Sequence, residues 1–190
     1  MKIRKKLWIW FFSLFVITIL SFRNAPPLTW VAIGDSITYL NDHLEETDYR
    51  VSKGYLTSVT EKLKNMQYLN LGRNGWAAVE FAKNLDRIDF GKDEVYTIFL
   101  GTNDWWQGRP VGSLADYTSR RGAQTFYGAI RAIMDKIRGL NSYASIILIT
   151  PMQRTDFVYI ADHSNNAFGS YKHLWEINQE YVRYTFRRRK

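Results

Sequence analysis

The sequence alternates short apolar runs with segments of helical periodicity, and this alternation limits the chain to a small group of folds. The apolar runs have strand length and contain β-branched and aromatic residues; they cover 30–33, 66–71, 94–100 and 145–150. The helical segments between them cover about 53–65, 77–88 and 125–138. Because strands and helices alternate, we predict an α/β fold with a parallel sheet and right-handed crossovers.

Each predicted helix carries an apolar stripe that should face the sheet. The first stripe is Tyr55, Val59 and Leu63, and the second is Phe81 and Leu85. The third stripe comprises Phe126, Ile130, Ile133, Met134 and Ile137. We expect Gly139 to end this third helix and Pro151 to end the last strand.

Small polar residues follow three of the predicted strands. The stretch Gly34-Asp35-Ser36-Ile37-Thr38 follows the first strand, Asn70 to Gly75 ends the second, and Gly101-Thr102-Asn103-Asp104 follows the third. The carboxyl ends of parallel strands meet at one edge of a sheet, where ligands bind in such folds. Each block alone is typical of an ordinary turn, in which Asp35 and Asp104 would bond nearby backbone.

The three blocks, taken in order, resemble the SGNH (GDSL) hydrolase family over about residues 28–171. The resemblance implies a three-layer α/β/α sandwich with a flavodoxin-like parallel sheet. It places Ser36 as the nucleophile, and it places Gly75 and Asn103 in the oxyanion hole with the backbone N–H of Ser36. Acyl transfer needs such a hydroxyl and such donors, and the family works without a cofactor or metal.

The family's last block, an aspartate three residues before a histidine, is absent from this sequence. Leu40, Ile160 and Ser170 precede the three histidines at that spacing, and the nearest substitute is the adjacent pair Asp162-His163. The Arg-rich ending predicts a chain cut short before a last strand and its histidine.

The net charge of +8 does not indicate nucleic-acid binding, because eight of the 26 basic residues lie in 2–6 and 187–190. The remaining 18 balance the 18 acidic residues, so no basic face for phosphates is evident. The chain has no cysteine, which excludes disulfides and a thiol nucleophile. His43, His163 and His173 are too scattered to indicate a metal site.

The N-terminus predicts membrane targeting. Four basic residues within the first six precede the apolar run Leu7–Leu20, which suits a signal peptide or an uncleaved anchor. We favour the anchor, because no small-x-small cleavage pattern precedes Pro26. Residues 1–23 then form the targeting segment, 24–28 a linker and 29–190 the hydrolase-like domain, which would lie outside the cytoplasm.

Three stretches predict irregular structure. Residues 41–48 form a polar, solvated loop, and 105–124 form a long connection beside the site. The aromatic side chains of this connection, Trp105, Trp106 and Tyr117, suit either a sugar face or ordinary core. After Pro151 the pattern decays, although 174–186 could form a helix.

These observations favour a metal-independent serine ester hydrolase, truncated and of low activity, acting on a small-molecule, lipid or carbohydrate ester. An alternative is a non-catalytic carbohydrate- or ester-binding module that keeps the cleft without the base. A third reading is a nonfunctional fragment.

Overall fold

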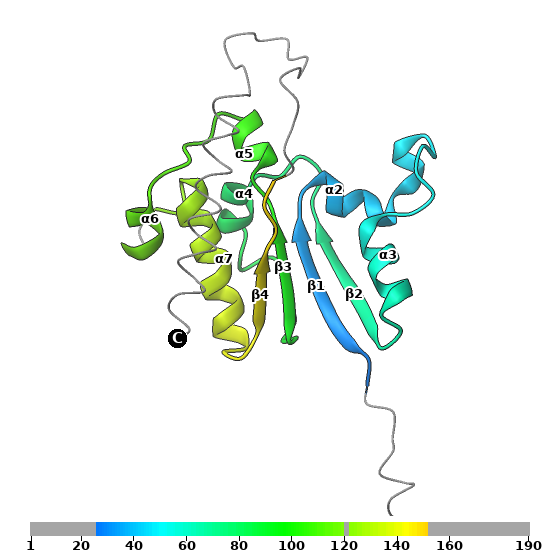
Figure 1. Cartoon of the computed structure of the whole chain (residues 1–190). Helices are drawn as coiled ribbons and strands as arrows, with labels where there is room; N and C mark the ends of the chain where they lie inside the picture. Colours follow the sequence, from blue (N-terminus) through cyan, green and yellow to red (C-terminus); the bar gives the residue numbers. More distant parts are fainter. Residues whose placement is uncertain (1–25, 120–121, 152–190) are drawn as a thin grey trace, which may run out of the picture.

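A four-stranded parallel sheet lies at the centre of the computed structural model, which describes residues 26–119 and 122–151 (Figure 1). The strands are β1 (Leu28–Gly34), β2 (Met66–Gly72), β3 (Val95–Phe99) and β4 (Ser145–Leu148), in the order β2-β1-β3-β4. Gly34 at the end of β1 is level with Gly72 of β2 and with Phe99 of β3. The carboxyl ends of three neighbouring strands therefore meet at one edge, and the predicted parallel sheet is confirmed.

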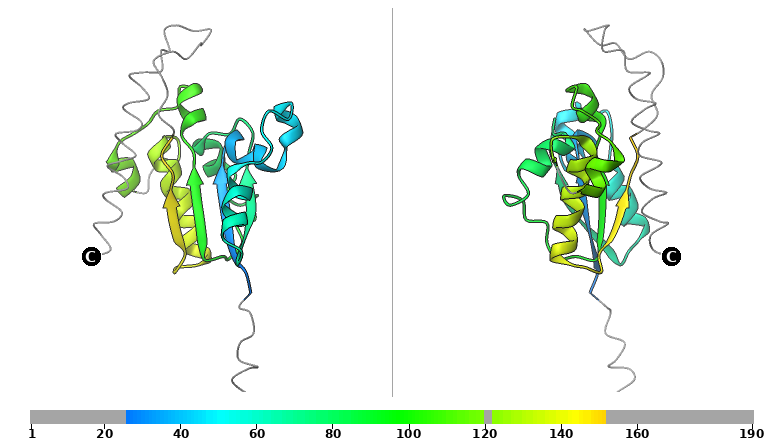
Figure 2. Two further views of the ribbon diagram at one scale, coloured as in Figure 1. Left: turned by 45° about the vertical axis from the view of Figure 1, so that its right-hand side comes forward. Right: turned by 90° about the vertical axis from the view of Figure 1, so that its left-hand side faces the viewer.

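Helices cover both faces of the sheet (Figure 2). The helical elements are α2 (Ser36–Tyr39), η1 (Leu40–Asp42), η2 (Leu44–Thr47), α3 (Tyr55–Lys62), α4 (Ala78–Lys83), α5 (Thr102–Trp106), α6 (Leu114–Ser119) and α7 (Phe126–Leu140). Val31 and Ile33 of β1 share a core cluster with α4 and α7, whereas Trp30 and Ala32 belong to a second cluster with α3. Since alternate residues of one strand face opposite layers, the sheet is the middle of three layers.

The apolar stripe of α7 packs into the first cluster as predicted, but the helix ends later than expected. All five stripe residues are buried. Thr125 caps the N-terminus, because its hydroxyl accepts a hydrogen bond from the Gly128 N–H at 3.2 Å. Gly139 lies inside the helix, which continues to Leu140. A glycine in a helix interior costs only about 1 kcal/mol, which is too little to end a helix held by its packing.

The buried anchor of α3 is Leu56, and the prediction for Leu63 is wrong. Leu56 is fully buried, whereas Leu63 is 45% exposed. Tyr55 and Val59 pack against the second cluster as predicted. The helix ends at Lys62, and Leu63 has the non-helical angles φ −104° and ψ 81°. Leu63 therefore lies outside the helix and does not share its buried face.

The segment 105–124 is not one long irregular connection, since it contains the end of α5 and the whole of α6. Trp105 and Tyr117 are buried, and Tyr117 belongs to the first core cluster. These two aromatic rings are therefore part of the core and are not exposed to stack on a sugar. Trp106 is exposed.

The segment 41–48 is also more ordered than predicted, because it forms η1 and η2. Asn41 is buried, and its Oδ1 accepts a hydrogen bond from the Leu56 N–H at 2.9 Å, in the first turn of α3. Its Nδ2 donates to the Tyr68 hydroxyl at 2.9 Å. One amide side chain thus fastens this segment to α3 and to β2.

Two strands end in glycines that touch the helix bearing Ser36. A Cβ built on Gly72 would lie 2.7 Å from the carbonyl carbon of Thr38 and 2.7 Å from the Cα of Tyr39, both backbone atoms of α2. A Cβ on Gly34 would lie 2.6 Å from the Cβ of Thr38. Real Cβ atoms are essentially never this close to other atoms. The absence of a side chain therefore allows α2 to lie directly on the ends of β1 and β2.

None of the helices in residues 26–119 and 122–151 is both long enough and apolar enough to cross a bilayer. The predicted targeting segment 1–23, the pair Asp162-His163, His173 and the predicted helix 174–186 lie outside the described residues.

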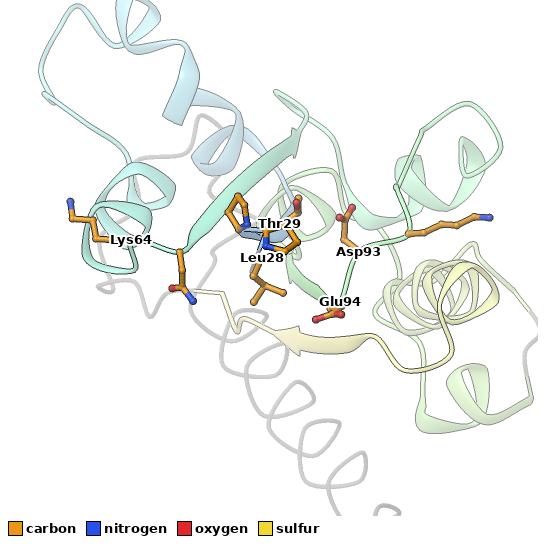
Figure 3. Close-up of a pocket in the computed structure, with 9 residues that line it drawn as sticks. Leu28, Thr29, Lys64, Asp93 and Glu94 are labelled. Atoms are coloured by element: carbon orange, nitrogen blue, oxygen red, sulfur yellow. The ribbon is translucent and has the colours of Figure 1, made fainter. Parts of the chain in front are cut away.

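A cavity of about 950 Å³ lies at the opposite edge of the sheet, beside the amino ends of β1 and β3 (Figure 3). Its lining includes Leu28, Thr29, Lys64, Asp93 and Glu94. The polar blocks follow the carboxyl ends of the strands, so this cavity does not belong to the site that they predict.

Candidate active site

Ser36 begins α2 directly after β1. Asp35 is buried, and its Oδ1 accepts a hydrogen bond from the Ile37 N–H at 3.0 Å, which caps the helix. This is the local turn role predicted for Asp35. Ser36 itself is half-buried and lies at the start of the helix.

Asn70 of β2 holds the helix that carries Ser36. Its Nδ2 donates to the Thr38 carbonyl at 2.9 Å and to Asp42 Oδ2 at 2.8 Å, and its Oδ1 accepts from the Gly72 N–H at 2.8 Å. Arg73, just after β2, donates its backbone N–H to the Gly34 carbonyl at 2.9 Å. The first and second polar blocks are thus joined at the sheet edge.

Asp42 accepts hydrogen bonds from three neighbours in this region. Tyr68 donates to its Oδ1 at 2.7 Å, and Asn41 donates to the same oxygen at 2.8 Å. Partial burial acts to raise the pKa of Asp42, but the hydrogen bonds from Tyr68, Asn70 and Asn41 outweigh it and hold the pKa below its usual range. The carboxylate therefore stays ionised at neutral pH and joins η1 to β2.

Gly75 lies in an exposed turn after β2. The turn is closed by a hydrogen bond from the Trp76 N–H to the Arg73 carbonyl at 3.2 Å. Gly75 has φ +75°, in the left-handed region that favours glycine, and a Cβ there would meet nothing within 4 Å. Backbone conformation, rather than crowding, is therefore what requires glycine at this position.

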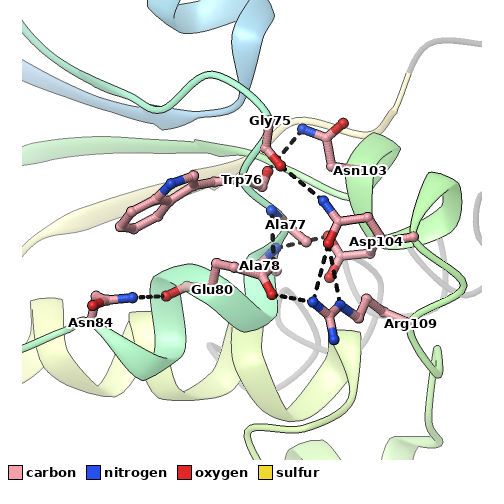
Figure 4. Close-up of polar contacts among 10 residues, drawn as sticks. Gly75, Trp76, Ala77, Ala78, Glu80, Asn84, Asn103, Asp104 and Arg109 are labelled. Atoms are coloured by element: carbon pink, nitrogen blue, oxygen red, sulfur yellow. Dashed lines mark hydrogen bonds and ion pairs between the residues drawn. The ribbon is translucent and has the colours of Figure 1, made fainter.

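Asn103 lies in the first turn of α5, directly after β3, and contacts the Gly75 turn. Its Nδ2 donates to the Trp76 carbonyl at 3.0 Å (Figure 4). An amide nitrogen carries two hydrogens, so the second can donate to a substrate oxygen. The structure thus brings the second and third polar blocks into contact, with the Asn103 amide held beside the residue that follows Gly75.

Asp104 has a structural role, as predicted, but its contacts extend beyond its own turn to a helix that begins 26 residues earlier in the chain. Its Oδ2 accepts a hydrogen bond from the Ala78 N–H at 2.8 Å, at the start of α4 (Figure 4). The residue is fully buried. Burial raises the pKa of Asp104 to about 6, against the opposing effect of the backbone N–H groups of Ala78 and Val79.

Two further residues near Gly75 were not predicted from the sequence. Gln107 Nε2 donates to the Gly75 carbonyl at 2.9 Å. Arg109 forms an ion pair with Glu80 of α4. The one signal in the sequence was their position, four and six residues after Asn103. A short helix at this place brings both side chains close to α4 and to the loop before it.

The three predicted site residues follow three adjacent strands, with Ser36 on the middle one. Hydrogen bonds link the first block to the second and the second block to the third. The convergence of Ser36 with Gly75 and Asn103 on one substrate oxygen stays a prediction.

His43 is the histidine within the described residues, and it does not hydrogen-bond Ser36 there. Its ring stacks on Tyr39, with centroids 4.0 Å apart. Its Nδ1 lies 3.5 Å from Glu45 Oε1 and 3.7 Å from Glu46 Oε1. These three side chains lie close enough together to hold a metal ion, a grouping that the scattered histidines of the sequence did not indicate.

Comparisons with known proteins identify chains of similar sequence and fold. A solved structure of a possible lipase from Chitinophaga pinensis DSM 2588 is 64% identical, with a TM-score of 0.67; the match covers 74% of this chain and 55% of that one. The chain thus spans just over half the length of that protein. A member of the lipolytic protein G-D-S-L family from Veillonella parvula DSM 2008 is 17% identical, with a TM-score of 0.53, covering 85% of this chain and 74% of that one.

The similarity to the Veillonella parvula protein supports the fold alone, because the two sequences are only 17% identical. No curated protein sequence matches the chain. The sequence model of the GDSL-like lipase/acylhydrolase family matches residues 32–176, a range that contains Ser36, Gly75 and Asn103. The chain therefore belongs to the GDSL-like lipase/acylhydrolase family.

Proposed function

We propose that the chain carries the machinery of a serine ester hydrolase of the SGNH type, with Ser36 as nucleophile. The observation that supports this most is the hydrogen bond from Asn103 to the Trp76 carbonyl, because it places an amide donor beside the Gly75 turn. Both lie at the carboxyl edge where β1 delivers Ser36. Membership of the family supports an ester as the substrate class.

The proposed chemistry is acyl transfer in two steps. Ser36 Oγ attacks the ester carbonyl carbon while a base takes the hydroxyl proton, and the carbonyl oxygen becomes an oxyanion. The N–H groups of Ser36 and Gly75 and the Asn103 amide donate to that oxygen. The alcohol leaves with a proton, and water then hydrolyses the acyl-serine by the same route.

The substrate is proposed as a small-molecule, lipid or carbohydrate ester. The similar protein from Chitinophaga pinensis is described as a possible lipase, which supports the acyl-ester class. No base for Ser36 is found among the described residues, so we propose low activity for the 190-residue chain.

A non-catalytic ester- or carbohydrate-binding module is the second candidate. It is favoured by the missing hydrogen bond between Ser36 and a histidine within residues 26–119 and 122–151, and by the absence of Asp-x-x-His from the sequence. Such a module would bind esters without reacting with them.

The test is covalent labelling with a fluorophosphonate probe, which reacts with activated serines. We expect slow modification that mass spectrometry maps to Ser36, that is lost in Ser36→Ala and that persists in Ser52→Ala, a change at an exposed serine. Reaction at several serines alike, or labelling unchanged in Ser36→Ala, would contradict the proposal. An unlabelled chain that still binds an acetylated sugar would favour the binding module.

We further propose that residues 1–23 tether the chain to the membrane with its body outside the cytoplasm. The support is the basic N-terminus followed by the apolar run Leu7–Leu20. In a bacterial host, the full chain should fractionate with membranes and be digested by protease added to spheroplasts. Phe15→Arg, with a cost of about 2.5–3.5 kcal/mol at the centre of a spanning helix, should release it, whereas Ser13→Ala should not. A full-length soluble cytoplasmic protein would contradict the proposal.

A further inference from the structure

A fully buried carboxylate lies at the junction of α4 and α5, outside the chemistry assigned so far. Asp104 Oδ2 accepts the Ala78 N–H at 2.8 Å, and Oδ1 has no hydrogen-bond partner within the described part of the chain. A buried carboxylate oxygen without a partner is costly, so its retention needs a reason.

The sequence at the start of α4 explains part of the need for Asp104. Ala77 occupies the N-cap position and has no side-chain oxygen to accept the first N–H groups of the helix. Glu80 Oε2 accepts the Ala77 N–H at 3.1 Å. The Ala78 N–H is satisfied from another element, by Asp104 of α5.

Helix α5, which carries Asp104, also bonds the residues just before α4 (Figure 4). Along the chain, α5 and the residue after it bond the Gly75 carbonyl through Gln107, the Trp76 carbonyl through Asn103, and the Ala78 N–H through Asp104. These three contacts lie within four consecutive residues of the loop, and the central one is made by the proposed oxyanion donor. The Trp76 and Gly75 carbonyls therefore belong to peptide units one and two places before the one that donates to Asp104.

We propose that Asp104 is a positioning residue of the oxyanion hole. Its buried carboxylate fixes the Gly75–Ala78 loop on α5. The distance between the Gly75 N–H and the Asn103 amide is thereby held constant. The role assigned to these two donors rests on the proposed function, whereas the coupling between Asp104 and the loop does not.

The coupling between Asp104 and the loop can be tested by changing the protonation state of Asp104. A neutral carboxyl group accepts hydrogen bonds more weakly than a carboxylate, so protonation should loosen the bond to Ala78. The charged group that acts on it is Glu80 of α4, which raises the pKa of Asp104 further and is itself paired with Arg109. Since the pKa of Asp104 is about 6, the carboxylate form and its firm contact are present above that pH.

The experiment is a pH titration of the ¹⁵N-labelled full chain by NMR, from about pH 4 to about pH 8, a range that brackets the titration. The signals followed are the backbone amides of Ala78 and Gly75 and the side-chain amide of Asn103. We expect all three to shift with one common midpoint near pH 6. The shifts should vanish in Asp104→Asn and persist in Asp86→Asn, a change at an exposed aspartate.

Movement of Ala78 without Gly75 and Asn103 would overturn the proposal, because Asp104 would then be a local helix cap. Absence of any common midpoint would overturn it too. If Asp104→Asn does not fold, the parent chain and Asp86→Asn decide the question by themselves. The readout needs no reaction at Ser36, so an unreactive serine would count against the proposed function and leave this inference standing.

Discussion

The 190-residue chain should hydrolyse an activated acetyl ester at a rate close to the uncatalysed background. A serine hydroxyl is a weak nucleophile while protonated, and no histidine of the described residues hydrogen-bonds Ser36. Loss of one member of a serine triad lowers turnover by a factor on the order of 10⁴ to 10⁶, although an intact oxyanion hole retains a residual rate over water. With the proposed oxyanion donors at Gly75 and Asn103, a small residual rate is expected.

The measurement compares the parent chain with Ser36→Ala and His163→Ala. We expect all three to lie near background, with the residual rate of the parent lowered only by Ser36→Ala. Robust turnover that disappears in both variants would overturn this expectation and identify His163 as the base. The His43→Ala variant is a matched control, because His43 stacks on Tyr39 and pairs with surface glutamates.

Gly72→Ala should destabilise the fold by about 3 kcal/mol or more, at or above the upper end of the usual cost of overpacking. The added Cβ would collide with backbone atoms of Thr38 and Tyr39, which cannot rotate away as a side chain can. Relief requires α2 to lift from the end of β2, and this movement also displaces Ser36. Chemical denaturation of the parent and the variant measures the loss.

Gly139→Ala is the control for this substitution. Gly139 lies inside α7 with nothing within 4 Å of an added Cβ, so alanine should stabilise the helix by up to about 1 kcal/mol. The two Gly-to-Ala changes are therefore expected to have opposite signs. Equal stabilities for the Gly72→Ala variant and the parent would mean that α2 does not lie on the end of β2.

The sheet and the three polar blocks were predictable because their signals are local. The apolar run at Trp30–Ile33 predicts a strand covered on both faces, and Gly34-Asp35-Ser36 predicts the turn that follows it. Asp35 bonds a backbone N–H two residues away, within the range that a turn motif specifies.

Long-range contacts explain what the sequence could not show. Asp104 and Asn41 have the composition of turn residues, but their partners lie 26 and 15 residues away, at the starts of α4 and α3. Both helices begin with residues that cannot cap themselves, Ala77 and Gly54. A helix start without its own cap residue is the one local signal that a distant side chain supplies the acceptor.

The strand order also determines where this scaffold tolerates change. The connection leaving β1 passes to the neighbouring β2, whereas the one leaving β3 leads, through α7, to β4 on the other side. The two connections diverge between the ends of β1 and β3, and such switch points are where α/β sheets open into crevices. Insertions after Ser36 or after Asn103 would therefore lengthen segments on opposite sides of this switch point. For the proposed ester hydrolysis, we expect such insertions to alter selectivity for the alcohol and acyl parts separately, with the sheet register unchanged.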